Sequence, residues 1–306
     1  MRAVLMHETG EPDVLSFEQA DPPEPADGEV LIAVHAASVN PIDWKYRRGM
    51  MPKELPAVLG SDVSGTVARS RAEGFEEGED VFGLASSGAY AELAVAPAGL
   101  IARKPAGVTH AEAAAIPVAA LTAWQALFDR GALQSGQRAL IAGAAGGVGH
   151  FAVQFASRAG AHVTGIGSAR NREFVLGLGA ADYVDYTSED VASRAAGVDL
   201  AFDTVGGEST LALLAAVRDG GTIVTIAGAP PEQAAAARGV RAELLIMSPQ
   251  AEQLQRIAAL VADGEVRVEI AEEIPLAGAA RAHALSESGH TRGKIILAVG
   301  TVESTI

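Results

Sequence analysis

Residues 138–150 read RALIAGAAGGVGH, and this stretch decides the fold. A short apolar run leads into a glycine-rich loop, and a helical pattern follows it. Glycines let a backbone turn tightly and approach a pyrophosphate, while the helix N-terminus offers free N–H groups and the positive end of its dipole. Ala144 stands where the G-x-G-x-x-G pattern has its first glycine. The stretch therefore predicts nucleotide binding, with a purely structural strand–helix turn as the alternative.

The same alternation of strand and helix continues along the chain. Strand-like runs at 162–166, 183–185, 199–202 and 222–227 are separated by helical patterning. This order is typical of βαβ units on a parallel sheet, so we predict an α/β fold with a doubly wound parallel sheet. A strand at 240–247 and a helix at 249–262 extend the pattern.

The first part of the chain has a different pattern of apolar and turn-forming residues. Up to about residue 110, short β-rich runs alternate with Gly and Pro clusters, which predicts a compact, largely antiparallel β domain. The run 294–299 is again β-like and is expected to return to that domain. We predict an inserted parallel-sheet domain at 119–263, between a first part at 1–118 and a return at 264–306.

Composition narrows the classes of function. The chain has 306 residues and is 49% hydrophobic, with a formal net charge of −15 and no cysteine. The acidic balance argues against binding to nucleic acid or to anionic membranes. The cysteine count excludes disulfides, thiol nucleophiles and Cys-based zinc sites. With no signal-peptide pattern and no apolar tract long enough to span a bilayer, we expect a cytoplasmic protein.

The end of the second strand predicts which nucleotide binds. An NAD site would carry an acidic residue there for the ribose 2′-hydroxyl. Residues 165–172 read GIGSARNR, with no acid. Ser168, Arg170 and Arg172 suit a dianionic 2′-phosphate, so NADP(H) is predicted over NAD.

A family resemblance is carried by segments in order over nearly the whole chain. The sequence resembles the medium-chain dehydrogenase/reductase superfamily, and most of all its zinc-independent quinone oxidoreductase and enoyl reductase branch. The matching segments are 39–43 with Arg47, 59–65, 121–124, 144–149, 178–180, 203–207 and 293–295. The resemblance implies a GroES-like, mainly β catalytic domain with an inserted Rossmann domain.

The resemblance also implies site residues. Gly146, Gly147 and Val148 should contact the pyrophosphate, Ser168 and Arg170 the 2′-phosphate, and Tyr186 the adenosine ribose. Thr122 and Val205 should border the nicotinamide, and Lys294 and the Ala227–Gly228 turn should close the far wall. Any of these residues could instead serve packing. A homodimer through an edge strand of the Rossmann sheet is a further implication, with 240–247 as the candidate strand.

The sequence departs from the zinc alcohol dehydrogenases of the same superfamily. Their ligands align with Asn40, Ser61 and a position near Val118, and only the carboxylates Asp43 and Asp62 remain. A catalytic zinc needs three good N, S or O ligands and an open position, so we expect no zinc.

Hydride transfer without a metal requires an acceptor that is already electrophilic, such as a quinone or an α,β-unsaturated carbonyl. Asn40 could donate to its carbonyl oxygen, and Tyr46 could donate a hydrogen bond or the final proton, with solvent as an equal candidate. Asp43 is a weaker candidate for substrate contact. Asn40 could also be a turn former, Asp43 a helix cap and Tyr46 a packing residue.

Two classes of function therefore compete. The first is an NADPH-dependent, metal-free reductase of a small electrophilic acceptor. The second is an NADPH-binding sensor or structural protein with little catalysis, which the same nucleotide motifs would also suit.

Overall fold

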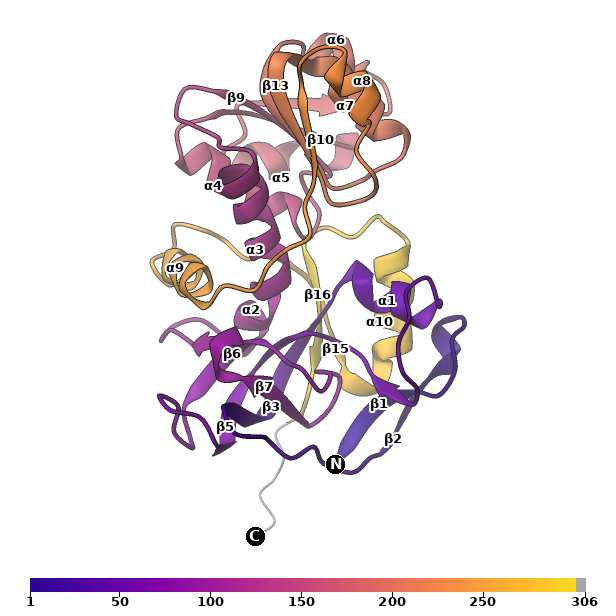
Figure 1. The fold of residues 1–306 in the computed structure, drawn as a ribbon, viewed down its shortest axis with the longest axis vertical. Helices are drawn as coiled ribbons and strands as arrows, with labels where there is room; N and C mark the ends of the chain where they lie inside the picture. The colour runs from indigo at the N-terminus through magenta and orange to yellow at the C-terminus, as the bar shows by residue number, and fades with distance from the viewer. Residues whose placement is uncertain (301–306) are drawn as a thin grey trace. The chain divides into compact units, whose positions relative to one another are not determined.

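The computed structural model describes residues 1–300 and divides into two compact units (Figure 1). Unit 1 combines Met1–Val118 with the chain from Pro249 onward, and unit 2 is Ala119–Ser248. Residues 301–306 of the predicted return segment lie outside the described residues. The second predicted boundary differs from the structure, because helix α9 (Ala251–Ala262) belongs to unit 1, where it lies against strand β8 (Ile101–Arg103). An amphipathic pattern shows that a helix covers a sheet, but it does not show which one.

Unit 1 contains two sheets. The larger has the order β15-β16-β3-β5-β6-β8, with β7 also paired to β3, and the smaller has the order β2-β1-β4. All pairs are antiparallel except β15 with β16, so the predicted antiparallel domain is confirmed. The other strands are β1 (Arg2–Met6), β2 (Leu15–Gln19), β3 (Glu29–Val39), β4 (Ala57–Val58), β5 (Asp62–Ser70), β6 (Asp80–Leu84), β7 (Leu93–Pro97), β15 (Ile270–Pro275) and β16 (Lys294–Ala298).

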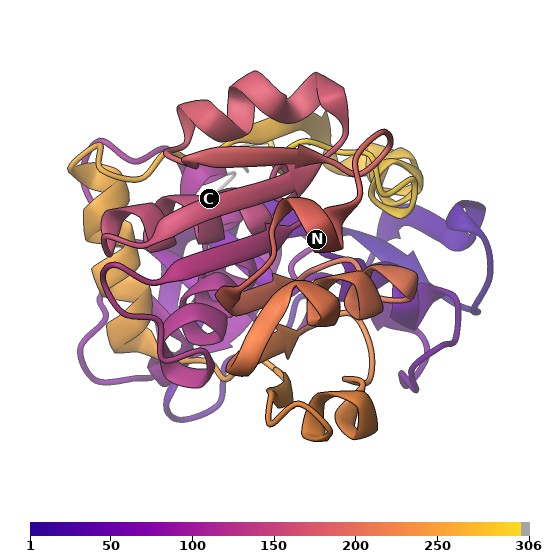
Figure 2. The same cartoon turned by 90° about the horizontal axis from the view of Figure 1, so that it is seen from above.

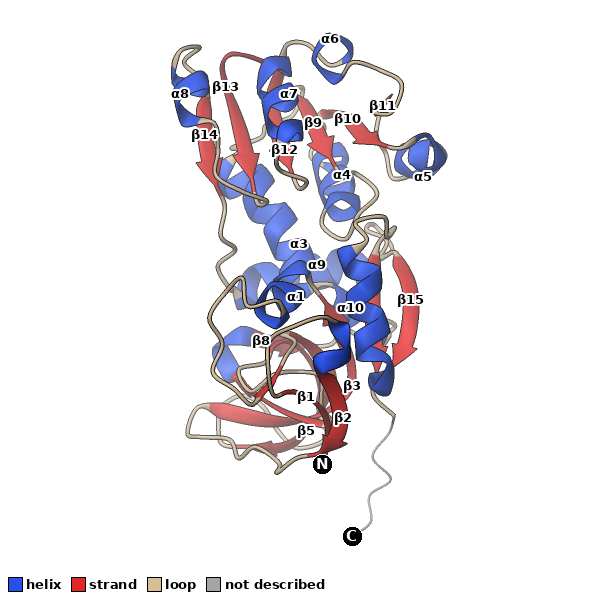
Figure 3. Ribbon diagram, turned by 90° about the vertical axis from the view of Figure 1, so that its right-hand side faces the viewer, coloured by secondary structure: helices blue, strands red, loops and turns tan. Residues whose placement is uncertain are grey.

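Unit 1 also contains short helices besides α9. They are α1 (Pro41–Arg47), α2 (His110–Ala115), α10 (Ala279–Glu287) and the 3₁₀ turns η1 (Pro12–Val14), η2 (Ala98–Leu100) and η5 (Leu276–Gly278). Thr109 and Glu112 have the spacing of a capping box, and this box opens α2, with the Glu112 carboxylate accepting from the Thr109 N–H at 2.8 Å. Figure 3 shows α10 beside β15, and α10 also contacts α1.

Strand register brings the two ends of the chain together. The yellow β16 pairs antiparallel with the indigo β3 in Figure 1, with Ile295 opposite Val39. In an antiparallel pair, the residue before Ile295 lies beside the residue after Val39. Lys294 therefore meets Asn40 at the start of α1.

Unit 2 is the predicted parallel sheet. Its order is β11-β10-β9-β12-β13-β14, and every pair is parallel. The strands are β9 (Arg138–Ala142), β10 (His162–Gly167), β11 (Asp182–Asp185), β12 (Val198–Asp203), β13 (Val217–Thr225) and β14 (Arg241–Leu244). β14 is shorter than the predicted strand at 240–247 and lies at the sheet edge.

Helices cover both faces of this sheet, as Figure 2 shows. The strands proceed from β9 to β11 in one direction along the sheet and from β12 to β14 in the other, so right-handed connections put the helices of the two halves on opposite faces. The helical segments of unit 2 are α4 (Gly149–Arg158), η4 (Ala169–Asn171), α5 (Arg172–Gly177), α6 (Val191–Arg194), α7 (Glu208–Ala216) and α8 (Glu232–Ala236). Helix α3 (Pro117–Trp124) begins at a proline, which suits the first position of a helix, and continues into the π-helix η3 (Gln125–Arg130). Among residues 1–300, none of the helices has the length and apolar character that crossing a membrane requires.

Candidate active site

Asn40 and Asp43 define the start of α1. Pro41 takes the first helical position, and Asn40 precedes it with extended backbone. The Asp43 carboxylate turns back and accepts from the Asn40 N–H at 2.8 Å, so the expected capping role of Asp43 is present. Because Asp43 is 2% exposed and its Oδ2 also accepts from the Tyr90 hydroxyl at 2.8 Å, the cap is part of the core.

A buried polar cluster continues from Asn40. Its side-chain oxygen accepts from the Lys294 ammonium at 2.5 Å, and its amide nitrogen donates to Asp62 at 2.8 Å. Lys294 also donates to the Val39 carbonyl at 3.3 Å and lies 3.8 Å from Asp62. The other Asp62 oxygen accepts from the Val118 N–H at 2.9 Å, at the N-terminus of α3. From the sequence, Asp62 was only a carboxylate that remains near the zinc-ligand positions of relatives, and Lys294 was a predicted neighbour of the cofactor. In the structure both side chains bind Asn40.

Burial dominates the electrostatics of this cluster. It raises the pKa of Asp43 to about 6, against the hydrogen bonds from Asn40 and Tyr90 that lower it. It also raises the pKa of Asp62, which Lys294 opposes, and lowers the pKa of Lys294, which Asp62 and Asp43 oppose. Two carboxylates thus share one ammonium, and the pKa of the Tyr90 hydroxyl lies well above its usual range.

Tyr46 is half-buried on α1 and packs against the core of unit 1. The Lys53 ammonium lies 5.4 Å from the centre of its ring, within the range of a cation–π contact. The structure gives Tyr46 a packing role, and its hydroxyl has no hydrogen-bond partner among the described residues. Its proposed contact with substrate stays a prediction.

Arg47 fixes α1 to α10. Its side chain is fully buried, and its guanidinium donates to His283 Nδ1 at 3.3 Å, to the Gly10 carbonyl and to the Glu287 carboxylate. Burial, with the Arg47 charge, lowers the pKa of His283 to about 3, so this imidazole is neutral. Sequence reasoning used Arg47 only as part of the resemblance and missed His283, since a single histidine in a helix carries no distinguishing pattern.

The glycine loop of unit 2 has the backbone that its sequence predicts. Gly143 has a φ of +64°, and a Cβ on Gly149 would overlap the Gly143 carbonyl oxygen. Only glycine at both positions lets α4 begin this close to the end of β9. Ala144 is accommodated because its side chain is fully buried against Gly165, and its N–H donates to the Ile166 carbonyl at 3.0 Å.

The turn after β10 carries the predicted phosphate ligands. Ser168 is half-buried, and its carbonyl accepts from the Tyr183 hydroxyl at 2.7 Å. Arg172 is committed elsewhere, because it pairs with Glu189 at 3.2 Å and lies over the Tyr183 ring. Arg170 is exposed in the same turn, and the contacts expected of Ser168 and of the two arginines with a 2′-phosphate stay predictions.

The other predicted cofactor residues lie in several parts of the chain. Tyr186 is 56% exposed, and its N–H donates to the Gly167 carbonyl at 3.3 Å. The Thr204 hydroxyl donates to the Ala142 carbonyl at 2.8 Å, which brings the exposed Val205 beside the glycine loop. Ala227 lies against Gly206 in the turn after β13. Thr122 is buried on α3, and Lys294 lies in unit 1.

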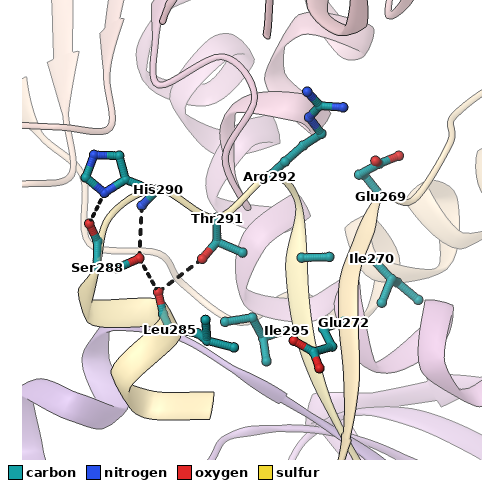
Figure 4. A pocket seen from close by; sticks show the side chains of 10 residues that line it. Glu269, Ile270, Glu272, Leu285, Ser288, His290, Thr291, Arg292 and Ile295 are labelled. Atoms are coloured by element: carbon teal, nitrogen blue, oxygen red, sulfur yellow. Dashed lines mark hydrogen bonds between the residues drawn. The ribbon is translucent and has the colours of Figure 1, made fainter. Parts of the chain in front are cut away.

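A hollow of about 490 Å³ opens in unit 1 between β15, β16 and the end of α10 (Figure 4). Leu285, Ser288, His290 and Thr291 line one side and are joined by hydrogen bonds, with Glu272 and Ile295 opposite. None of the predicted site residues lines this hollow.

The two units together define an oxidoreductase built from a GroES-like β unit and a dinucleotide-binding parallel sheet. Residues 26–106 match the family described as alcohol dehydrogenase GroES-like domain, and residues 178–297 match zinc-binding dehydrogenase. The chain belongs to the medium-chain dehydrogenase/reductase family, on the side of its quinone oxidoreductases.

Three relatives illustrate the likeness. The chloroplast envelope quinone oxidoreductase homolog of Arabidopsis thaliana is 36% identical, over 92% of this chain and 93% of that protein. The quinone oxidoreductase structure from Coxiella burnetii is 33% identical with a TM-score of 0.93, covering 98% of this chain and 99% of that one. The Escherichia coli quinone oxidoreductase complexed with NADPH is 27% identical with a TM-score of 0.91, covering 97% of this chain and all (100%) of that one.

Proposed function

We propose that this oxidoreductase uses NADPH, without a metal, to reduce a quinone or an α,β-unsaturated carbonyl compound. The observation that carries the choice of cofactor is the turn after β10, where Ser168 and the exposed Arg170 follow the strand and no acidic residue does. A guanidinium and a hydroxyl suit a 2′-phosphate, whereas a carboxylate would repel it.

The residues of unit 2 fit a dinucleotide. The glycine loop and the start of α4 would hold the pyrophosphate through Gly146, Gly147 and Val148. The loop is packed so closely that a Cβ on Gly149 would overlap its backbone. Tyr186 would border the adenosine ribose, and Thr122, Val205 and Ala227 would border the nicotinamide. The resemblance also places Lys294 beside the nicotinamide, although its ammonium donates hydrogen bonds to Asn40 and to the Val39 carbonyl.

The residues of unit 1 do not fit a catalytic zinc. The Asn40 oxygen already accepts from the Lys294 ammonium, and Asp62 lies 3.8 Å from the same cation. A second cation at these atoms would meet the repulsion of a buried positive charge. Ser61 supplies no strong ligand in place of the histidine of zinc relatives. The family description names zinc, but this donor set favours metal-free chemistry.

Bound NADPH supplies a hydride, and the chain has to stabilise the oxyanion that forms on the acceptor. Asn40 is the proposed donor to that oxygen, since its amide is rigidly held at the start of α1. Tyr46 or solvent would then supply the proton. Asp43 would hold Asn40 in place through the hydrogen bond that it accepts from the Asn40 backbone N–H.

The cofactor assignment is tested by binding and turnover. Kd values for NADPH and NADH are measured on the wild type, on Arg170→Ala and on the control Arg218→Ala, which changes an exposed arginine at the amino end of β13. Loss of a charge-assisted contact should weaken NADPH binding about 10- to 100-fold in Arg170→Ala and leave NADH binding unchanged. Equal losses for both cofactors would contradict the 2′-phosphate assignment.

Turnover is followed as loss of NADPH absorbance against quinones, enones and enoyl thioesters. Oxidation with at least one of these classes is expected, at a rate that added zinc or a chelator does not change. Tight NADPH binding with no turnover on any of them would favour the sensor role instead. The cytoplasmic location and the homodimer through β14 remain proposals, tested by fractionation of cells and by light scattering.

A further inference from the structure

Asn40 is held through almost every polar atom that it has. Its backbone N–H donates to Asp43 at 2.8 Å, and its backbone carbonyl accepts from the Asp43 N–H at 3.0 Å. In the side chain, the oxygen accepts from Lys294 at 2.5 Å and the nitrogen donates to Asp62 at 2.8 Å. The residue is 2% exposed, and its two side-chain partners are 4% and 0% exposed.

The chemistry of the partners fixes which way the amide faces. An ammonium can only donate hydrogen bonds, and a carboxylate can only accept them. A reversed Asn40 amide would place its N–H groups against the Lys294 ammonium and its oxygen against the Asp62 carboxylate. Because these groups are buried, both repulsions would act in a medium of low dielectric.

Among residues 1–300, one donor of the amide has no hydrogen-bond acceptor. The amide nitrogen carries two hydrogens, and Asp62 accepts one of them. Lys294 draws electron density toward the amide oxygen, which strengthens the remaining N–H as a hydrogen-bond donor. A donor that is fixed in advance and polarised by a buried charge is what a developing oxyanion requires.

We propose that Lys294 and Asp62 are positioning residues, which set the orientation of the Asn40 amide so that its second N–H donates to the carbonyl oxygen of the acceptor. This inference rests on the proposed function and deepens it. A buried lysine–carboxylate pair is in itself a weak source of stability, because desolvation offsets the attraction. Because Lys294 and Asp62 bind the oxygen and the nitrogen of the Asn40 side-chain amide, the pair can orient this amide.

The test is a double-mutant cycle on the full-length protein. Lys294→Met and the isosteric Asp62→Asn are each made in the wild type and in Asn40→Ala. The matched controls are Lys104→Met and Asp80→Asn, which change another lysine–aspartate pair of unit 1, with 3.5 Å between its charged atoms. For each variant, kcat, the KM for NADPH and the urea midpoint are measured with the acceptor on which the wild type is most active.

Lys294→Met and Asp62→Asn should each lower kcat about 10- to 100-fold, because a misoriented Asn40 loses part of the stabilisation that an oxyanion donor provides. The KM for NADPH should stay within about twofold of the wild-type value. In Asn40→Ala, neither should lower kcat by more than about twofold further, since residues that act through Asn40 are not additive with its loss. The controls should keep the wild-type kcat. Asp62→Asn preserves side-chain volume, so it carries the test if Lys294→Met does not fold.

Two results would overturn the inference while the proposed function stands: an unchanged kcat in both variants of an active enzyme, or equal losses with and without Asn40. A wild type that binds NADPH but reduces no acceptor would instead overturn the proposed function, and this inference with it.

Discussion

Replacing Asp43 by asparagine should change how the stability of the protein depends on pH. Burial raises the pKa of this carboxyl from 3.8 to about 6, so the folded state binds its proton more tightly than the unfolded state does. Between these two pH values the folded chain holds more protons, and stability falls as the pH rises. The full effect corresponds to about 3 kcal/mol, at about 1.36 kcal/mol for each unit of pKa.

The asparagine variant cannot ionise, so it lacks this decrease. Between pH 4.5 and pH 8, its free energy of unfolding should gain about 2 kcal/mol relative to the wild type. An asparagine oxygen can still accept from Tyr90 and from the Asn40 N–H, as Asp43 does now. Any cost of burying the new N–H groups is the same at every pH, so it cancels in the comparison between pH values.

Urea unfolding of both proteins at half-unit steps across that range measures the difference directly. The control is Asp182→Asn, an exposed aspartate on β11, whose difference from the wild type should stay within about 0.5 kcal/mol at every pH. A difference between Asp43→Asn and the wild type that does not change with pH would refute the reasoning. So would a decrease in the relative stability of the variant at pH 8.

Three further outcomes are expected. Burial lowers the pKa of His110 to about 4, so its contribution is complete above pH 6.5 and falls by up to about 3 kcal/mol toward pH 4; His110→Asn should remove that loss in urea titrations. Arg47→Met should cost about 3 kcal/mol of unfolding free energy, because it removes a buried cation that donates to the Gly10 carbonyl, to His283 and to Glu287. Arg48→Met should cost clearly less in the same urea titrations, because Arg48 is the more exposed of the two arginines that pair with Glu287. Gly149→Ala should abolish measurable NADPH binding, since its Cβ overlaps a backbone carbonyl of the loop; binding of wild-type strength would contradict this.

The parallel sheet could be predicted from the sequence because its signals are local. The glycine loop, the apolar runs and the capping box each lie within a dozen residues and match β9, α4 and α2. The glycine pattern of this loop is informative because Gly143 has a positive φ and Gly149 has no room for a Cβ, so other residues would be strained there. The insertion of one unit into the other was predicted from the change of sequence pattern near residue 110, and the resemblance implied the same arrangement.

The partners of Asn40 could not be predicted, because they depend on register between distant strands. Lys294 lies 254 residues away in sequence and reaches Asn40 only through the pairing of β16 with β3. Arg172 was considered for the 2′-phosphate because residues 165–172 contain arginines and no acid, and its pairing with Glu189, which follows β11, could not be read from that stretch. The placement of α9 failed for the same reason, since an amphipathic helix does not encode which sheet it covers.

The return of β16 to unit 1 has a consequence for biosynthesis. Unit 2 is one continuous segment and can fold as soon as Ser248 has left the ribosome, but the sheet around Asn40 lacks a strand until Ala298 follows. Until then Asp62 is a buried carboxylate without its cation, which disfavours compaction of the β unit. A chain that ends before Lys294 would thus leave the β unit incompletely folded and sensitive to protease, while the parallel sheet of unit 2 has all of its strands.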